Sequence, residues 1–351
     1  EETVQKESDA LHGGKLEAKI SDYQDLLRRI KGHLGYNYEI TYPDTPFILA
    51  ADDLLPSEIH ALESTKVEGV ILKQTSPTSH TAILLRASGI SSMIINDDIS
   101  TGKHEVILDA SAGVLVSTPT TEDIENALES LTSYKDTQAK VYAKRHQEAV
   151  TSTQTKIAVV ANISDLSSAQ LAKKEGAEGV GLFRTEFLFE KQKPTMQMQQ
   201  KAYEEIFALF DDITVRTLDV GGDKALPYIN LPEEKNPFLG IRGIRLLDTH
   251  PDIIKAQLLA IFGAAKSKTL KIMFPMVATL EEFNHAKEFA TNIAKEHQID
   301  ISSIQFGIMI EVPSVLFNIT SFNDVVDFYS VGTNDLSQYL YAIERTHPTL
   351  T

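Results

Sequence analysis

The sequence lacks cysteine altogether among its 351 residues. Disulfide bonds, thiolate nucleophiles and zinc–thiolate sites are therefore excluded from this chain. Their absence fits a reducing compartment, and we expect a cytoplasmic protein. The sequence also has no apolar run approaching the roughly 18 residues of a membrane helix and no recognisable signal peptide, so we expect no membrane insertion.

Basic residues are scarce relative to acidic ones. The chain has 33 lysines and arginines against 49 aspartates and glutamates, a formal net charge of -16. Nucleic-acid surfaces need clustered positive charge, so this balance argues against a nucleic-acid partner. An acidic protein that binds an anion must gather its few basic residues in one cleft.

The first part of the chain reads as a helix followed by a small α/β domain. Residues 16–34 have apolar positions spaced three and four apart, typical of an amphipathic helix that ends near Gly35. A charge-rich helix is predicted from about Thr120 to Val150, with hydroxyl and acidic residues suited to its start. Short apolar runs separated by turns predict strands at 47–50, 69–72, 93–95, 106–108 and 114–116.

The second part of the chain repeats a strand, a loop and a helix. Strands are expected at 157–163, 179–184, 213–219, 271–276, 305–311 and 326–332. This rhythm predicts an α/β multidomain protein whose larger domain is a (β/α)8-type barrel. Six predicted strands instead of eight indicate a C-terminally incomplete barrel, and the chain begins without methionine, which favours a fragment or a processed chain.

Charged and amide side chains lie at the ends of these predicted strands or shortly after them. They are Arg184, Arg216, Lys224, Glu311, Asn334, Asp335 and Arg345. Barrels of this type carry their active sites at the carboxyl ends of the strands. Two carboxylates are hard ligands for Mg²⁺, and guanidinium groups bind phosphate and carboxylate with paired donors. Each residue alone reads more simply as a turn, a helix cap or a surface ion pair, but together they predict a site for Mg²⁺ and a charged substrate.

His80 lies among hydroxyl residues, in the segment Thr78-Ser79-His80-Thr81, before an apolar helix. The start of a helix attracts anions, so a phosphoryl group on this imidazole would be stabilised there. The alternative is an ordinary capping loop with an incidental histidine.

Taken together, these motifs resemble enzyme I of the bacterial phosphoenolpyruvate-dependent sugar phosphotransferase system. The resemblance spans about residues 16–345. Its most specific stretches are EGVGLFRTEFLF at 178–189, VRTLDVGGDKALPY at 215–228, NPFLGIRGIR at 236–245, IMFPM at 272–276 and VGTNDLSQY at 331–339. The resemblance implies a helical remnant of the subdomain that docks the phosphocarrier HPr at 1–36, a phosphohistidine swivel domain at 37–120, a linker helix at 121–154 and the barrel at 155–351.

The resemblance also implies roles for individual residues. His80 matches the phospho-accepting nucleophile, phosphorylated on Nε2. We expect either Thr78 or Ser79 to hold the other ring nitrogen and set the tautomer. Positions that hold phosphoenolpyruvate are matched by Arg184, Arg216, Lys224, Asn334 and Arg345, with Arg242 in the same cleft. Glu311 and Asp335 match the Mg²⁺ ligands. The implied reaction moves phosphate from phosphoenolpyruvate to HPr or a paralogue, and a homodimer through the barrel is expected.

Two features depart from the family pattern. Thr75-Ser76-Pro77 stands where the family has Gly-Gly-Arg, and the acid cysteine of the family has no counterpart in a chain without cysteine. One competing hypothesis is an enzyme like phosphoenolpyruvate synthase or pyruvate phosphate dikinase, which would require a nucleotide-binding domain. The other is a non-catalytic phospho-relay regulator with the same fold.

Overall fold

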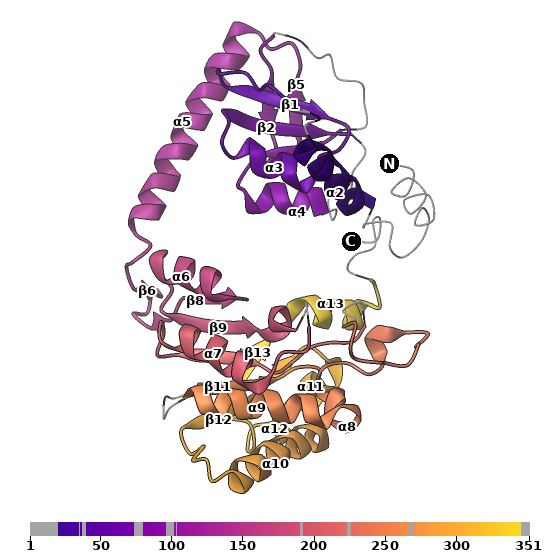
Figure 1. Cartoon of the computed structure of the whole chain (residues 1–351). Helices are drawn as coiled ribbons and strands as arrows, with labels where there is room; N and C mark the ends of the chain where they lie inside the picture. The colour runs from indigo at the N-terminus through magenta and orange to yellow at the C-terminus, as the bar shows by residue number, and fades with distance from the viewer. Residues whose placement is uncertain are drawn as a thin grey trace. The chain divides into compact units, whose positions relative to one another are not determined.

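The structure is a computed structural model that describes residues 20–34, 36, 40–73, 80–95, 102, 104–189, 192–222, 226–265, 268 and 270–344. The chain divides into two compact units, Glu1–Gln138 and Ala139–Thr351 (Figure 1). Helix α5 (Thr121–Ala143) runs from the first unit into the second.

The first unit is built on a three-stranded parallel sheet in the order β1-β2-β3. Its strands are β1 (Phe47–Ala51), β2 (Val67–Leu72) and β3 (Ser92–Ile94), and a hairpin of β4 (Ile107–Asp109) and β5 (Val114–Val116) follows. All five strands confirm the prediction to within two residues. Helices α3 (Pro56–Leu62) and α4 (His80–Ala87) contribute Ile59, Leu62 and Leu85 to the core beside the sheet.

The helix predicted at 16–34 is described from Ile20 to His33 as α2. Its polar side packs on α3, where Asp25 accepts a hydrogen bond from the hydroxyl of Ser57 and Arg28 pairs with Glu58. Leu26 and Ile30 are exposed on α2. Helix α2 therefore contacts α3 through polar side chains and also has exposed apolar side chains.

The long helix predicted to reach Val150 ends earlier. Its start is confirmed, because the hydroxyl of Thr120 accepts a hydrogen bond from the amide of Asp123, whose carboxylate in turn caps Thr120. Helix α5 stops at Ala143, and Ala149–Val150 (β6) instead pairs with Lys156–Ile157 (β7) in an antiparallel hairpin. A hydroxyl side chain in the turn between these strands accepts a hydrogen bond from the backbone of the turn itself. Such local hydrogen bonds compete with those of a helix.

The second unit contains six parallel strands in sequential order, from β8 at one edge to β13 at the other. They are β8 (Val160–Ile163), β9 (Gly179–Arg184), β10 (Ile213–Arg216), β11 (Leu270–Phe274), β12 (Ile304–Ile310) and β13 (Phe328–Val331). A parallel sheet with neighbouring strands joined by helices is the arrangement of a (β/α) barrel, here incomplete. The predicted fold class is thereby confirmed.

Helices connect the strands and lie side by side in chain order. They include α6 (Leu166–Lys174), α7 (Met196–Phe207), α9 (Pro251–Ala265) and α10 (Leu280–Glu296). Figure 1 shows α7, α9 and α10 next to the strands, and α9 contacts both α7 and α10. Capping boxes start α6 at Asp165 and α10 at Thr279, so these boundaries follow from local sequence.

The two faces of the six-stranded sheet have different side chains. Phe183, Val215 and Ile272 are aligned across three strands and belong to the large core shared with the helices. One residue further along, Arg184, Arg216 and Met273 are aligned in the same way. Because side chains alternate along a strand, this second row lies on the opposite face, toward the inside of the incomplete barrel.

Short helices complete the second unit after several strands. They are η2 (Thr185–Leu188), η3 (Pro237–Leu239), η4 (Gly243–Arg245), α8 (Leu246–Thr249), α11 (Pro313–Phe317), α12 (Ile319–Phe322) and α13 (Thr333–Tyr341). Several begin at the carboxyl end of a strand, which places their first residues at the rim of the sheet. Among the described residues, no helix has the length and apolar character to cross a bilayer.

Candidate active site

The carboxyl ends of β9, β10, β12 and β13 bring ionisable side chains together. Arg216 is the last residue of β10, and Glu311 follows β12 directly. Glu186 lies in η2 after β9, and Asp335 lies at the start of α13 after β13. All four are buried, although their side chains are ionisable. Burying charged groups is costly unless they are paired, so their partners decide what the cluster can do.

Arg216 is held from two sides. Its Nη2 donates to Glu186 Oε1 at 2.8 Å, and its Nη1 lies 3.4 Å from Asp219 Oδ2. The same oxygen of Glu186 accepts the backbone N–H of Asp219 at 3.1 Å. Burial disfavours the charge on Arg216, but Glu186, Asp219 and Glu311 outweigh that effect and raise its pKa. Arg216 is therefore a fixed cation at the end of its strand.

Arg242 bridges two carboxylates that come from distant parts of the chain. Its Nε and Nη2 donate to the two oxygens of Asp219 at 2.9 and 3.0 Å. Its Nη1 and Nη2 donate to Asp335 Oδ1 and Oδ2 at 2.9 and 3.2 Å. Despite burial, these hydrogen bonds and charges raise the pKa of the guanidinium. The arrangement ties the segment after β10 to the segment after β13.

A close backbone contact places Arg242 there. Gly221 has a φ of +119°, and a Cβ at this position would lie 2.2 Å from the carbonyl oxygen of Ile241. The N–H of Gly243 donates to the carbonyl of Val220 at 3.2 Å. Only glycine allows both the positive φ and the close approach. The glycines in this region therefore shape the turn that delivers Arg242.

Glu311 is an acid of the cluster whose pKa is raised well above its ordinary value. Its Oε1 accepts the backbone N–H of Met276 at 2.6 Å, and Met276 has a left-handed backbone with φ 59°. Burial is the largest influence, and together with the charges of Asp219 and Asp335 it raises the pKa of Glu311 to about 7, against the opposing effects of the Met276 amide and Arg216. A nearby cation would stabilise the ionised form of such a buried carboxyl group, so this site favours cation binding.

Two buried polar atoms of the cluster have no hydrogen-bond partner among the described residues. They are Nε of Arg216 and Oε2 of Glu311. Buried polar groups in folded proteins are almost always satisfied, so such atoms mark places where a ligand completes the site. An unsatisfied guanidinium N–H suits a phosphate or carboxylate oxygen, and an unsatisfied carboxylate oxygen suits a divalent cation.

The cluster can supply Mg²⁺ with only a small number of carboxylate ligands. Within the described part of the chain, no group of three or more aspartate, glutamate or histidine side chains could hold a metal ion. Mg²⁺ in phosphate-binding sites commonly takes only one or two carboxylates and fills its shell with water and substrate oxygens. Glu311, with one unsatisfied buried oxygen, fits that pattern, and Asp335 fits it while also bound to Arg242.

The remaining predicted residues are placed as follows. Arg184 is the last residue of β9 and is exposed, and Asn334 is exposed at the start of α13. His80 is the first residue of α4, at the helix start expected for it, although its side chain lies outside the described residues. Thr78, Lys224 and Arg345 lie outside the described residues altogether.

Several residues of the cluster were absent from the predicted set. Glu186 and Asp219 lie within the motifs quoted above, and their spacing of two or three residues from an arginine was the available signal. Gln257 is buried behind the cluster, on helix α9, whose other buried residues are apolar. A polar residue at a core position of an apolar helix is the only sequence signal that could have identified it.

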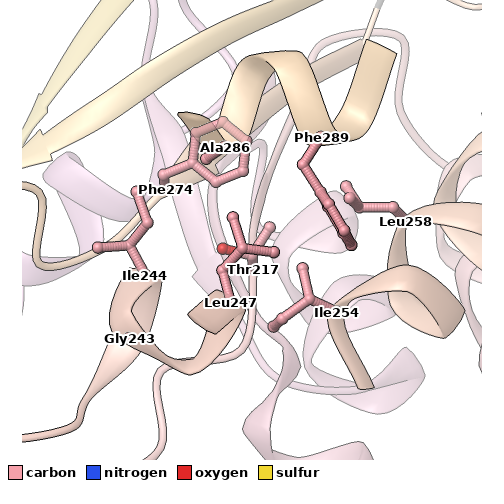
Figure 2. Close-up of a pocket in the computed structure, with 9 residues that line it drawn as sticks. All are labelled: Thr217, Gly243, Ile244, Leu247, Ile254, Leu258, Phe274, Ala286 and Phe289. Carbon is pink, nitrogen blue, oxygen red and sulfur yellow. The ribbon is translucent and has the colours of Figure 1, made fainter. Parts of the chain in front are cut away.

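A small apolar cavity lies next to the residue that follows β10, among side chains of β11 and of the neighbouring helices (Figure 2). Its lining comprises Thr217, Gly243, Ile244, Leu247, Ile254, Leu258, Phe274, Ala286 and Phe289. Thr217 follows Arg216 directly, and Gly243 follows Arg242. The backbone that carries both arginines thus separates the charged cluster from an apolar layer.

Comparison with known sequences assigns a family to each unit. Residues 138–351 match the PEP-binding domain of PEP-utilising enzymes, and residues 43–113 match the mobile domain of the same enzymes. The first match covers the strands and the charged cluster described above. The second covers β1 to β4 and all of α4, the helix that begins at His80.

Relatives with curated names are similar over nearly the whole chain. The multiphosphoryl transfer protein of Rhodobacter capsulatus is 40% identical over 97% of this chain and 42% of its own length. Multiphosphoryl transfer protein 1 of Escherichia coli is 36% identical over 95% of the chain and 43% of its own length. The phosphoenolpyruvate-protein phosphotransferase of Staphylococcus carnosus is 35% identical over 93% of the chain and 59% of its own length.

The chain thus spans between two fifths and three fifths of the length of these relatives. The family matches agree with the charged cluster at the carboxyl ends of the strands and with the sequence motifs that carry it. The chain belongs to the family of phosphoenolpyruvate-utilising enzymes.

Proposed function

We propose that this chain acts in a phosphoenolpyruvate-protein phosphotransferase, taking the phosphoryl group from phosphoenolpyruvate onto His80. The observation that carries the proposal is the pair of buried, unsatisfied atoms, Arg216 Nε and Glu311 Oε2, within one charged cluster. One is a donor suited to an anion, and the other is an acceptor suited to a cation. A phosphate ester bound with a divalent cation would satisfy both.

The proposed step breaks the bond between phosphorus and the enol oxygen and forms a bond between phosphorus and Nε2 of His80. The enolate that leaves is protonated to pyruvate. Phosphoryl transfer passes through a loose transition state, so alignment and charge stabilisation supply most of the catalysis. Arg216 is suited to this task because Glu186 and Asp219 hold it in place before substrate binds. Arg184, exposed at the neighbouring strand end, can close on the substrate.

The family resemblance implies Mg²⁺ as the cofactor. In our proposal Glu311 and Asp335 hold it, and the ion would neutralise charge on the phosphoryl and enolate oxygens. Asp335 is oriented by its paired hydrogen bonds to Arg242, which gives Arg242 a structural role in positioning a proposed metal ligand. Lys224, Asn334 and Arg345 are proposed to complete the binding of phosphoenolpyruvate, as the family resemblance implies.

The onward acceptor is proposed to be a histidine of HPr or a paralogous phosphocarrier. The names of the relatives, multiphosphoryl transfer protein and phosphoenolpyruvate-protein phosphotransferase, support a protein acceptor. The cytoplasmic location and the homodimer through the barrel are proposed from the composition and the family resemblance. Light scattering of the purified chain measures its oligomeric state directly.

The proposal is tested by incubating the chain with Mg²⁺ and phosphoenolpyruvate and locating acid-labile phosphate by mass spectrometry. We expect phosphate on His80, pyruvate in equal amount, and no phosphate on the His80→Ala variant. His60→Ala is the matched control, because His60 is an exposed histidine of the same unit on α3, and it should label normally. Phosphate on another histidine, or none on the wild-type chain, would refute the proposal.

The metal assignment has its own test. The Glu311→Gln variant keeps the size and buried position of the side chain but loses the negative charge that attracts a cation. We expect its rate of Mg²⁺-dependent labelling to fall at least about tenfold. Labelling at the wild-type rate over a range of Mg²⁺ concentrations would mean that Glu311 is not a metal ligand.

A further inference from the structure

One buried amide lies directly behind the charged cluster. Gln257 is fully buried on α9, a helix whose other buried residues are all apolar. Its Oε1 accepts the backbone N–H of Leu218 at 2.9 Å, and its Nε2 donates to the hydroxyls of Thr185 at 2.9 Å and Tyr203 at 3.3 Å. The carbonyl and both N–H groups of the amide therefore have partners. A fully satisfied polar network in an apolar core costs little and fixes one arrangement of its members.

The network holds the backbone on both sides of Thr217. On one side Gln257 binds the N–H of Leu218, and on the other the hydroxyl of Thr185 donates to the carbonyl of Arg216 at 3.0 Å. Between them, the N–H of Thr217 donates to the carbonyl of Met273 at 3.0 Å. Three consecutive residues at the end of β10 are thus held by hydrogen bonds.

The hydrogen bonds around Thr217 also fix the direction of the neighbouring Arg216 side chain. Figure 2 shows Thr217 among the apolar side chains that line the cavity. Side chains alternate along an extended backbone, so Arg216 points to the opposite face, where Glu186 receives its guanidinium. A small rotation of the peptide groups beside Thr217 would swing Arg216 away from that partner.

We propose that Gln257 is a positioning residue for phosphoenolpyruvate binding, acting through Thr185 and the backbone at 216–218 on the guanidinium of Arg216. This inference rests on the proposed function, because Arg216 must bind the substrate for its position to matter. Replacing a residue that orients a ligand-binding group commonly changes the affinity of the site for its ligand. Gln257 does not touch the substrate in this proposal, and its effect passes entirely through Arg216.

The test compares variants by two measurements: the phosphoenolpyruvate concentration that half-saturates labelling of His80, and the labelling rate at saturation. Gln257→Met keeps the length of the side chain but has no amide, so Leu218 and Thr185 lose their partner. We expect the half-saturating concentration to rise about tenfold. The saturated rate should stay within about twofold, because the transferring groups themselves are intact.

Two controls separate positioning from simple destabilisation. Tyr203→Phe removes only the far end of the network, so we expect a lower melting temperature with an unchanged half-saturating concentration. Thr185→Val removes the hydroxyl that binds the carbonyl of Arg216 and should behave like Gln257→Met, whereas Thr185→Ser keeps that hydroxyl and should restore wild-type behaviour. If Gln257→Met does not fold, the comparison of Thr185→Val with Thr185→Ser still tests the inference.

The outcomes are distinguishable. A wild-type chain that binds phosphoenolpyruvate in calorimetry but does not label His80 refutes the proposed transfer, and the dissociation constants of the same variants then test the positioning role. Wild-type affinity in both Gln257→Met and Thr185→Val would overturn the inference while leaving the proposed function intact. A wild-type chain that neither binds nor transfers overturns both.

Discussion

Arg242 and Asp335 are joined by two parallel hydrogen bonds of 2.9 and 3.2 Å across 93 positions of sequence. The planar guanidinium matches the two carboxylate oxygens, and two further hydrogen bonds, from Nε and Nη2, go to Asp219. One side chain thereby connects the carboxyl ends of β10 and β13. The stability of the rim and the position of a proposed metal ligand depend on the same contact.

Replacing Arg242 by lysine tests this connection. Lysine keeps the charge but offers a single point of attachment instead of a planar fork, so the buried carboxylates of Asp219 and Asp335 lose most of their hydrogen bonds to residue 242. We expect the free energy of unfolding to fall by about 2 to 4 kcal/mol in chemical denaturation followed by circular dichroism. Arg245→Lys is the matched control on a partly exposed side chain nearby and should cost about 1 kcal/mol or less. Equal losses in the two variants would contradict the bridging role.

Gly221 should be irreplaceable for a backbone reason. An alanine there would place its Cβ 2.2 Å from the carbonyl oxygen of Ile241 at a φ of +119°. We expect Gly221→Ala to cost about 3 kcal/mol or more of unfolding free energy and to displace Arg242. Gly222→Ala is the control, since its Cβ would meet only the ring of Phe238, at 3.3 Å, with φ +66°. That variant should cost only about 1 kcal/mol, and a similar cost for both would show that the contact with Ile241 is unimportant.

Glu311 should make the stability depend on pH. Its pKa is raised from 4.5 to about 7 in the folded chain, so between these values the folded state holds a proton that the unfolded state has released. Stability from this group is therefore highest at low pH and is lost as the pH rises through this window. The amide of the Glu311→Gln variant cannot ionise, so without Mg²⁺ this variant should gain about 2 kcal/mol relative to wild type between pH 5 and pH 8.

The measurement is chemical denaturation of both proteins at several pH values in the presence of a chelator. Comparing the two proteins cancels the contributions of all other titrating groups that the substitution leaves unchanged. A stability difference that stays constant over this range would show that Glu311 ionises normally.

Arg184 and Arg216 should respond differently to the same substitution. Arg184 is exposed at the end of β9, so Arg184→Gln should raise the half-saturating phosphoenolpyruvate concentration about tenfold while changing unfolding free energy by only about 0.5 kcal/mol. Arg216 is buried against Glu186, and Arg216→Gln should weaken binding and also cost about 3 kcal/mol of stability. Loss of stability in Arg184→Gln would show that its exposed side chain has a structural role.

Much of the fold could be predicted because its signals are local. Strand β9 coincides with the predicted segment, and the helix starts at Thr120 and Thr279 follow from hydroxyl and acidic residues three positions apart. Apolar runs and caps act over a few residues, so they can be read directly along the chain. Where such a signal was weak, as between Ala143 and Val150, the predicted helix extended too far.

The sequence by itself determined the order of the elements and which residue types stand at the strand ends. Only the tertiary structure decided that Arg242 bridges Asp219 and Asp335, that Glu311 receives the amide of a left-handed Met276, and that Gln257 supports the backbone beside Arg216. These contacts join segments far apart in sequence. They depend on strand register, turn geometry and burial, which are properties of the assembled sheet and leave no periodic pattern along the chain.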